Sequence, residues 1–568
     1  MKRCPECRRD YHDDSLLYCL EDGAALIQGS VPSPDEPATA ILRDTSPSGE
    51  DVTMAQMSLT GSETQPSPDN LLKGGFSANR AVRLSVVGVA VVIVLVGTFF
   101  GYRYLSNANS RQINSIAVMP FVNESGNADI DYLTDGMTDA LISSLSKVPS
   151  LNVKAHTSVF RYKSKDTASK TIASDLQVQA LVNGRVTQHG DQLSVDVDLV
   201  DPQTENVLWT QRYDRKSADI VSLQSEIAGD VSGKLRARLS GEDEAKIRKT
   251  YTVDPEAYQL YLRGEFYWHK RGYDSLLKAA DLYDQAIQKD PTYALAYAGL
   301  AETYTLYPDY AITKPEDSYP KSKAAALKAL DLDDSLAEPH TVLARYYNYW
   351  EWDRAKAEQE YLRAIELDPN YATAHHWLGS DVLTQLGRFD EGLAQMSRAR
   401  ELDPFSTVIA VNYGDTLFYA RRYDDAIAAY RKAHELDPDF YLSYNGLVMA
   451  QAMKGNFGDA IKISQKNAKG PLTESYLAFA LAKSGNRDGA RQIIESMKKK
   501  ALSDYVPSYA FAIAYCALGQ KDDAFIWLNK EIDEHGTAAV TIGVDPLLDD
   551  LRSDPRFTEA LKRVKLAE

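Results

Sequence analysis

Cysteine, positive charge and the short motifs of common enzymes are all scarce in this sequence. Its 568 residues include only four cysteines, too few for a disulfide framework, and the formal net charge is −17. An acidic surface repels a phosphate backbone, so nucleic acid is not expected as a partner of the bulk of the chain. No phosphate-binding loop, G-x-S-x-G elbow, H-E-x-x-H pair or kinase signature occurs. We therefore predict that the protein is not an enzyme, and no small-molecule substrate is evident.

Three of the four cysteines lie within the first twenty residues. Cys4 and Cys7 form a C-x2-C pair, and Cys19 opens a second pair in which Asp22 stands where the fourth cysteine would be. Four such ligands bind a tetrahedral zinc ion, and a carboxylate can replace one thiolate. We predict that residues 1–28 bind Zn²⁺ through these four side chains, with His12 as the competing fourth ligand and a metal-free remnant as the alternative. The stretch resembles the short zinc-ribbon heads of bacterial membrane-anchored sensor and kinase-like proteins.

A polar linker and a charge-free run follow this head. Residues 29–79 are rich in proline, serine, threonine and acidic residues, which predicts a disordered acidic linker. The nineteen residues between Arg83 and Arg103 carry no charge, close to the roughly 20 that a membrane-spanning helix needs. This run predicts a transmembrane helix over 83–105. Flanking basic residues and the thiols favour a cytoplasmic amino terminus, which predicts a single-pass protein of the bacterial inner membrane with periplasmic carboxyl-terminal domains.

Residues 112–242 have the pattern of an α/β domain. An apolar run at 115–121 is typical of a buried strand, helical spacing covers 132–147, and 192–200 alternates as a half-exposed strand does. The predicted order of elements is βαβαβββα. Asp135 and Asp139 are one helical turn apart in this domain, a spacing that most often marks a solvated face, and His156 has no histidine or cysteine near it in sequence.

Four segments of this domain carry a resemblance: Ile116-Ala-Val-Met-Pro-Phe121, Leu133-Thr-Asp-Gly-Met-Thr-Asp-Ala-Leu141, Val182-Asn-Gly-Arg-Val186 and Leu208-Trp-Thr-Gln-Arg-Tyr-Asp214. They are similar in order and spacing to the TolB amino-terminal or FlgO-like domain, a relative of the CsgG fold. The resemblance implies a non-catalytic domain that often faces the cell envelope.

The carboxyl-terminal half repeats an Asp-Pro pair at a nearly constant interval. Pro369, Pro404 and Pro438 end three such pairs and are 35 and 34 residues apart. A period of about 34 is typical of a helix-turn-helix solenoid, and Gly414, Tyr430 and the turn between them follow the tetratricopeptide-repeat pattern. Residues 250–568 are therefore identified as about eight such helical pairs with a carboxyl-terminal capping helix.

The resemblance implies a concave groove lined by the first helix of each repeat. Counting family positions along the three strongest repeats selects seven groove residues: Arg345, Asn348, Tyr349, His376, Asp415, Phe418 and Tyr419. A groove of mixed polar and aromatic side chains suits an extended peptide.

The predicted fold class is thus multidomain: a small zinc ribbon, one transmembrane helix, an α/β domain and an all-α tetratricopeptide-repeat solenoid. Every module is of a binding type, which predicts a membrane scaffold or sensor for protein or peptide partners. The alternative is a membrane-bound signalling or transcription-regulatory protein whose zinc-ribbon head is the cytoplasmic output.

Overall fold

The computed structural model describes residues 113–127, 130–235, 245, 247–310, 312–466 and 472–567, and three short strands near the amino terminus. The chain divides into two compact units, residues 1–97 and 98–568. In the first unit, β1 (Lys2–Arg3) pairs antiparallel with both β2 (Asp10–Tyr11) and β3 (Ile27–Gln28). The four predicted zinc ligands and the predicted linker lie outside the described residues, so the zinc ribbon stays a prediction.

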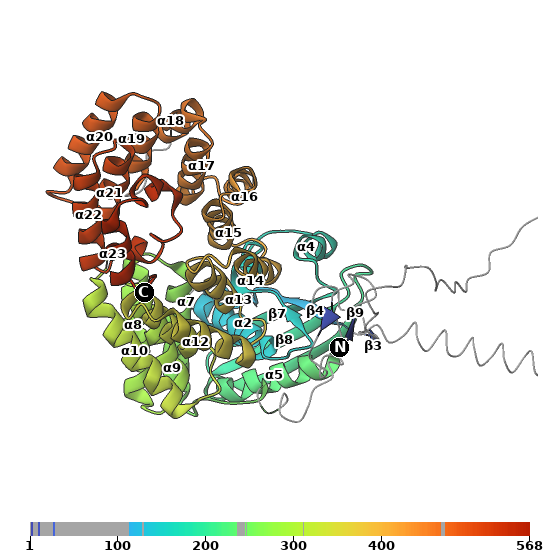
Figure 1. The fold of residues 1–568 in the computed structure, drawn as a ribbon. Coiled ribbons are helices and arrows are strands. Elements are labelled where there is room, and N and C mark those ends of the chain that lie inside the picture. Colours follow the sequence, from blue (N-terminus) through green and yellow to red (C-terminus); the bar gives the residue numbers. More distant parts are fainter. Residues whose placement is uncertain are drawn as a thin grey trace, which may run out of the picture. The chain divides into compact units, whose positions relative to one another are not determined.

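The second unit begins with an α/β domain built on one mixed sheet (Figure 1). The strands run in the order β6-β4-β7-β8-β9, and β5 also pairs with β7. β4 pairs parallel with β6 and β7, and β5 pairs parallel with β7, whereas β7, β8 and β9 form an antiparallel meander. The strands are β4 (Ser115–Val118), β5 (Val122–Asn123), β6 (Asn152–Val153), β7 (Ala180–His189), β8 (Gln192–Val200) and β9 (Val207–Lys216).

Helices cover both faces of the parallel part of the sheet. On one face α2 (Asp131–Ser146) and α5 (Ile220–Lys234) pack against Ile116 and Val118 of β4. On the other, α3 (His156–Phe160) and α4 (Ser169–Leu176) pack against Ala117. Successive β4 side chains thus enter opposite cores, as the period of two along a strand requires.

The predicted order of this domain is close to the observed one. The strand 192–200 has the predicted bounds, and the helix predicted over 132–147 is observed as Asp131–Ser146. Two elements were not predicted, the two-residue strand β5 and the five-residue helix α3. Both are too short to show a hydrophobic period in the sequence.

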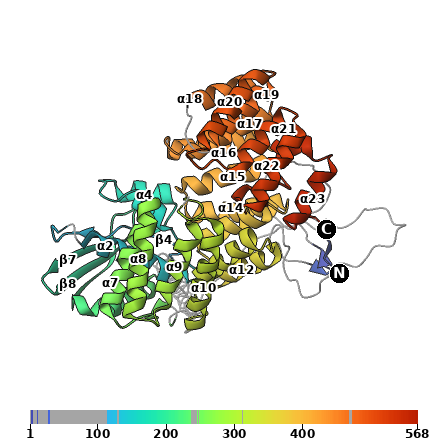
Figure 2. The same ribbon diagram turned by 90° about the vertical axis from the view of Figure 1, so that its left-hand side faces the viewer.

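Eight helical pairs follow among the described residues, which agrees with the predicted solenoid (Figures 1 and 2). The pairs are α7 (Pro255–Lys270) with α8 (Tyr273–Lys289), α9 (Ala294–Leu306) with α10 (Pro315–Leu332), α11 (Glu338–Arg345) with α12 (Arg354–Leu367), α13 (Ala372–Trp377) with α14 (Phe389–Leu402), α15 (Thr407–Tyr419) with α16 (Tyr423–Leu436), α17 (Tyr441–Met453) with α18 (Phe457–Lys466), α19 (Thr473–Lys483) with α20 (Arg487–Lys500), and α21 (Ser508–Ala517) with α22 (Lys521–Asp533).

A tyrosine between two glycines sets the spacing of neighbouring repeats. A Cβ atom at Gly414 would lie 2.6 Å from the Tyr430 ring, and one at Gly446 would lie 2.3 Å from it. The pattern recurs in the first repeats, where the ring of Tyr283 stands between Gly264 and Gly299. Only glycine lets the first helices approach the ring this closely, because any side chain would overlap it.

An Asp-Pro pair follows the second helix of four repeats, at Asp290, Asp368, Asp403 and Asp437. At Asp437, the backbone N–H still bonds to the Ala433 carbonyl, while the carboxylate accepts a hydrogen bond of 2.9 Å from the Asp439 N–H. Proline then prevents the helix from continuing.

The carboxyl-terminal segment returns to the third repeat. It consists of η5 (Thr537–Val540), η6 (Pro546–Leu551) and α23 (Pro555–Arg563). The His535 ring stacks on Trp352 with 4.6 Å between centroids, and Arg354 donates to the Val564 carbonyl at 2.8 Å. The carboxyl-terminal end of the array is therefore in direct contact with the third repeat.

The predicted location in the inner membrane is not supported. The predicted span, residues 83–105, lies outside the described residues, and no described helix is both long and apolar enough to cross a bilayer. The longest described helix, α10 with 18 residues, contains Lys321 and Lys328, whose charges are costly in hydrocarbon. This finding contradicts the predicted cytoplasmic amino terminus and periplasmic carboxyl-terminal domains, and we correct that prediction accordingly. It had relied on one charge-free run of residues.

Candidate functional site: a cavity between the sheet domain and the repeats

The sheet domain and the first repeats share one hydrophobic core. Tyr258 and Leu262 of α7 belong to the same buried cluster as Leu133 and Met137 of α2. A Cβ atom at Gly136 would lie 2.8 Å from the Leu262 side chain, so α2 and α7 are in close contact. The two domains are therefore held in a fixed relation by packing, not only by a linker.

Two Asp-Pro turns of the repeats also bind the sheet domain directly. Ser146 at the end of α2 donates to Asp368 at 2.5 Å, and Ser158 in α3 donates to Asp403 at 2.5 Å. The Asn370 amide donates to three backbone carbonyls at the carboxyl end of α2, those of residues 146, 148 and 151. The turn that ends a repeat helix thus serves a second purpose here, as the docking edge for the sheet domain.

A cavity of about 1190 Å³ lies between these parts. Its walls come from α2, α3 and α5 of the sheet domain and from the first helices of the first six repeats. Nine carboxylates line it, against four lysine or arginine side chains. The carboxylates are Asp139, Glu265, Glu302, Asp309, Glu338, Asp368, Asp381, Asp403 and Asp437, and the bases are Lys147, Lys249, Arg271 and Arg345.

Several of these carboxyl groups hold their protons more tightly than usual. Burial, reinforced by the neighbouring charges of Glu338 and Glu265, raises the pKa of Glu302 to about 8. Burial likewise raises the pKa of Glu265 to about 7, although a 2.5 Å hydrogen bond from the Tyr283 hydroxyl opposes this shift. The acidic wall of the cavity therefore gains negative charge as the pH rises through neutrality.

Two of the first helices are wound more widely where they line the cavity. After α11, η3 (Tyr346–Trp350) forms a π-helical turn in which the Glu351 N–H bonds to the Tyr346 carbonyl at 3.2 Å. After α13, η4 (Leu378–Leu383) does the same, and Thr384 donates to Gly379 at 3.1 Å. Such turns often occur at functional sites because they change the direction of side chains.

Three of the seven predicted groove residues line this cavity: Arg345, Tyr349 and His376. The Arg345 guanidinium donates to Asp309 at 3.0 Å and lies over the rings of Tyr349 and Trp377. Burial lowers the pKa of His376 to about 3, and its ring contacts the Asn412 amide at 2.8 Å.

The other four predicted groove residues are not among its lining residues. Asn348 is fully buried and donates to the Asp381 carbonyl at 3.0 Å, and Phe418 lies in the hydrophobic core with 1% of its surface exposed. Asp415 accepts a hydrogen bond of 2.7 Å from Tyr430, and Tyr419 packs against the core. A position counted along a repeat does not show which side of the helix faces the neighbouring repeat and which faces the cavity. Ligand contact at any of the seven positions stays a prediction.

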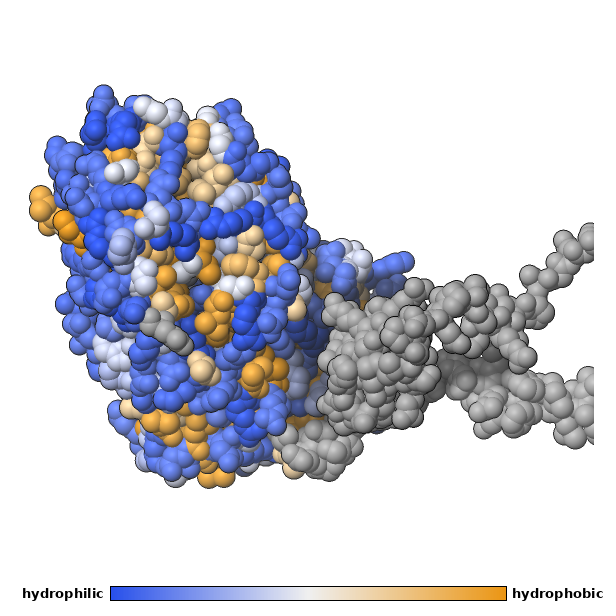
Figure 3. Space-filling view, viewed as in Figure 1, coloured by the Kyte–Doolittle hydropathy of each residue, from blue (hydrophilic) through white to orange (hydrophobic). Residues whose placement is uncertain are grey.

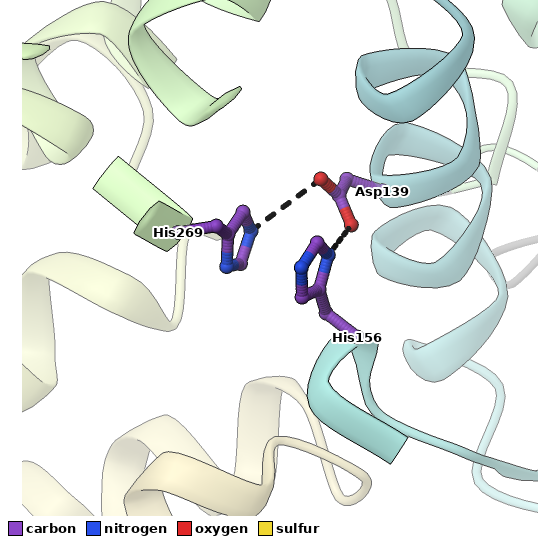
Figure 4. A group of neighbouring side chains, drawn as sticks. All are labelled: Asp139, His156 and His269. Carbon is purple, nitrogen blue, oxygen red and sulfur yellow. Dashed lines mark hydrogen bonds and ion pairs between the residues drawn. The ribbon is translucent and has the colours of Figure 1, made fainter. Parts of the chain in front are cut away.

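A second group of side chains joins the two domains at the cavity wall: Asp139 of α2, His156 of α3 and His269 of α7 (Figure 4). Nδ1 of His156 is hydrogen-bonded to one carboxylate oxygen of Asp139, and Nε2 of His269 lies 3.4 Å from the other. The two imidazole rings are stacked with 3.6 Å between centroids and 4° between planes. Glu265 is close as well, with its carboxylate 3.9 Å from Nε2 of His269.

The sequence indicated this group only in part. The i, i+4 spacing of Asp135 and Asp139 was interpreted as a solvated face. Instead Asp135 is buried and paired with Lys163 at 2.6 Å, and Asp139 faces the two histidines. His269 was not singled out, and no spacing in the sequence connects it with His156, 113 residues earlier.

Two family models match parts of the chain. The HilA/YgeH-like transcriptional regulator, second domain, matches residues 111–229, and the tetratricopeptide repeat matches residues 409–440. Together with the observed helical pairs, this confirms that the chain contains tetratricopeptide repeats. The matched description of the sheet domain differs from the predicted TolB or FlgO likeness, which stays a prediction.

One curated relative is a putative adenylate cyclase 3 of Rhizobium meliloti, which is 32% identical over 231 residues. The match covers 40% of this chain and 39% of that protein, so the chain spans about two fifths of the relative's length.

Several solved structures are also similar to parts of the chain, and two of those named below, YrrB and TTC0263, are described as tetratricopeptide-repeat proteins. YrrB, described as having an unusual peptide-binding site, is 25% identical and covers 34% of this chain and 89% of its own, with a TM-score of 0.24. PilF of Pseudomonas aeruginosa is 18% identical over 38% and 95% of the two chains, with a TM-score of 0.31. TTC0263 of Thermus thermophilus is 18% identical over 36% and 99%, with a TM-score of 0.28. At these TM-scores the likenesses carry no further argument.

Proposed function

We propose that this protein is a scaffold that binds an extended segment of a protein or peptide partner in the cavity between its sheet domain and its first six repeats. The observation that carries this proposal is the cavity itself, a volume of about 1190 Å³ whose walls carry more carboxylates than bases. Tetratricopeptide repeats are built to present such a concave surface.

The surface outside the cavity shows less evidence of a binding site. The face in Figure 3 is mostly hydrophilic, and its hydrophobic residues occur in scattered groups and not as one continuous patch. This face therefore shows no large continuous hydrophobic patch of the kind that marks a protein-binding surface.

The lining selects a partner with basic side chains. The excess of carboxylates attracts a cation, and Tyr258, Tyr261 and Trp268 offer aromatic rings beside them. A lysine or arginine entering the cavity would favour the charged form of Glu265 and Glu302. Binding would then release protons near neutral pH, so affinity should rise as the pH increases from about 6 to 9.

The experiment is a selection of random decapeptides on the full chain, followed by titration of the selected peptides. We expect lysine- or arginine-containing peptides, and at least a tenfold loss of affinity in the isosteric variant Glu302→Gln. Glu366→Gln is the matched control, because Glu366 lies on α12, is 70% exposed and pairs with Arg363 at 2.6 Å outside the cavity lining. Peptides without basic residues, or equal affinity in both variants, would overturn the proposal.

A second candidate is a regulatory protein in which the bound partner is the signal. The match of residues 111–229 to the second domain of a transcriptional regulator favours it. In this proposal the predicted zinc ribbon of residues 1–28 is the output. A gel-shift assay with the zinc-loaded full chain tests it, and sequence-preferring binding that disappears in Cys4→Ser would support it. An unchanged shift in that variant, or no shift at all, would contradict it.

A further inference from the structure

We propose that Asp139, His156 and His269 form a binding site for a divalent transition-metal ion that joins the sheet domain to the first repeat. The three side chains come from α2, α3 and α7, and one potential ligand atom from each lies within 4.8 Å of the other two. This inference does not depend on peptide binding in the cavity.

The first argument is the chemistry of the donors. Two imidazoles and a carboxylate are a common ligand set for Zn²⁺ and its first-row neighbours. Zinc binds nitrogen and oxygen at about 2.0–2.2 Å, which puts two ligands of a tetrahedral ion about 3.3–3.6 Å apart. The 3.4 Å between Asp139 Oδ2 and His269 Nε2 falls within this separation.

The second argument is an unsatisfied atom. Oδ2 of Asp139 is buried and accepts no hydrogen bond from the described residues, whereas Oδ1 is bonded to His156. Nε2 of His269 lies 3.4 Å from Oδ2. An unprotonated imidazole nitrogen has a lone pair to donate, and a cation between the two groups would bind both.

The surroundings of the cluster leave these donors available. Lys163, which precedes α4, is already paired with Asp135 at 2.6 and 2.7 Å. Tyr283 donates to one oxygen of Glu265 at 2.5 Å, and the other oxygen lies 3.9 Å from His269 Nε2. Glu265 is thus positioned either to complete the ligand set or to orient His269.

Because the two imidazole rings are stacked, binding of a metal ion must change their orientation. An imidazole binds a metal in the plane of its ring, and the rings of His156 and His269 are stacked with 3.6 Å between centroids and 4° between planes. The rings must therefore tilt toward each other around the ion. Figure 4 shows that a nitrogen of each ring is directed toward Asp139, so the carboxylate is the group that both rings already share.

The test uses the full chain with Cys4→Ser and Cys7→Ser, so that the predicted zinc ribbon cannot bind. Zn²⁺ is titrated calorimetrically, and Co²⁺ is used to report the ligand field by its visible absorption. We expect one equivalent of Zn²⁺ and Co²⁺ bands without thiolate charge transfer. His269→Ala and the isosteric Asp139→Asn should each weaken binding at least tenfold.

The matched control is His340→Ala. His340 also contacts a carboxylate, that of Glu360 at 2.6 Å, but belongs to no group of three potential ligands in the described part of the chain. Its removal should leave the affinity for Zn²⁺ unchanged. Absence of Zn²⁺ binding, or equal binding in all variants, would overturn the proposal. If His269→Ala does not fold, Asp139→Asn decides, since it keeps the shape of the side chain.

Discussion

The two halves of the repeat array use the same helical pair in different ways. From α15 to α23 the buried side chains form one continuous hydrophobic cluster. From α7 to α14 the repeats are divided among several small clusters, and one of these belongs to the sheet domain as well. Buried charged residues are concentrated in this first half, among them Glu302, Arg345, Asp368 and Asp381. The first half therefore has less continuous apolar packing and more buried polar groups, which face the sheet domain and the cavity. The second half is held together by a single hydrophobic core.

The largest expected effect is in the core of the second half. Phe511 is 1% exposed and stacks on Trp527 with 4.2 Å between centroids. Removing a buried phenyl ring leaves a cavity, so Phe511→Ala should cost about 3–5 kcal/mol of unfolding free energy. Urea denaturation combined with hydrogen exchange in α21 measures it. Leu502→Ala, at a side chain that is 89% exposed, should change stability by less than about 0.5 kcal/mol. Equal effects would contradict the proposed difference between core and surface.

The next effect is at the docking edge of the first half. Asn370→Ala leaves three carbonyls at the end of α2 without their amide donor, which should cost about 1–3 kcal/mol. Hydrogen exchange of residues 146–151 should increase. Asp439→Ala is the matched control, since Asp439 follows the Asp-Pro pair of a repeat with no such bonds to the sheet domain. If the two variants lost equal free energy of unfolding, the conclusion that only the first half of the array docks to the sheet domain would be wrong.

The docking edge should also respond to pH. Burial raises the pKa of Asp368 from 3.8 to about 6 in the folded state. The folded state then binds a proton more tightly than the unfolded state, so this group contributes most stability below pH 4 and loses that contribution as the pH rises to 6. Relative to Asp368→Asn, the wild type should lose about 1–3 kcal/mol across this window. Thermal unfolding of both proteins at pH 4–7 measures the difference.

The control for that titration is Asp437→Asn. The Asp437 carboxylate accepts a backbone hydrogen bond as Asp368 does, but it makes no hydrogen bond to the sheet domain among the described residues. This variant leaves the hydrogen bond between Ser146 and Asp368 in place, so it should not reproduce the effect of Asp368→Asn. A rise in wild-type stability relative to Asp368→Asn between pH 4 and 6 would contradict the sign of the prediction.

The smallest expected effect on stability is at the ion pair that joins the fifth repeat to the carboxyl-terminal segment. Arg421 donates to both oxygens of Asp549 at 2.6 and 2.8 Å, and the two side chains are 46% and 35% exposed. Exposed ion pairs contribute little, so Arg421→Ala should cost about 0.2–1 kcal/mol. The difference should shrink in 1 M salt, where screening acts over about 3 Å. A larger loss that salt does not reduce would show that packing, and not charge, holds the segment.

Much of the fold could be predicted because it is local. The strand at 192–200 alternates in its own sequence, and the helical pairs follow from small residues, tyrosines and Asp-Pro stops at a fixed interval. The residues of the candidate site were harder to predict from the sequence. Arg345, Tyr349 and His376 were found by counting along repeats, whereas Phe418, selected in the same way, is in the core.

The sequence by itself determined the repeat: second helices that end at the regularly spaced Asp-Pro pairs, and glycines that leave room for the rings of Tyr283 and Tyr430. Only the tertiary structure decided that Asp368 and Asp403 would also bind the sheet domain, and that Asp437 would not. It also decided that Asp139, His156 and His269 would meet at one wall of the cavity. The physical reason is that capping and periodicity act between neighbours along the chain, whereas docking depends on which surfaces the packed helices bring together.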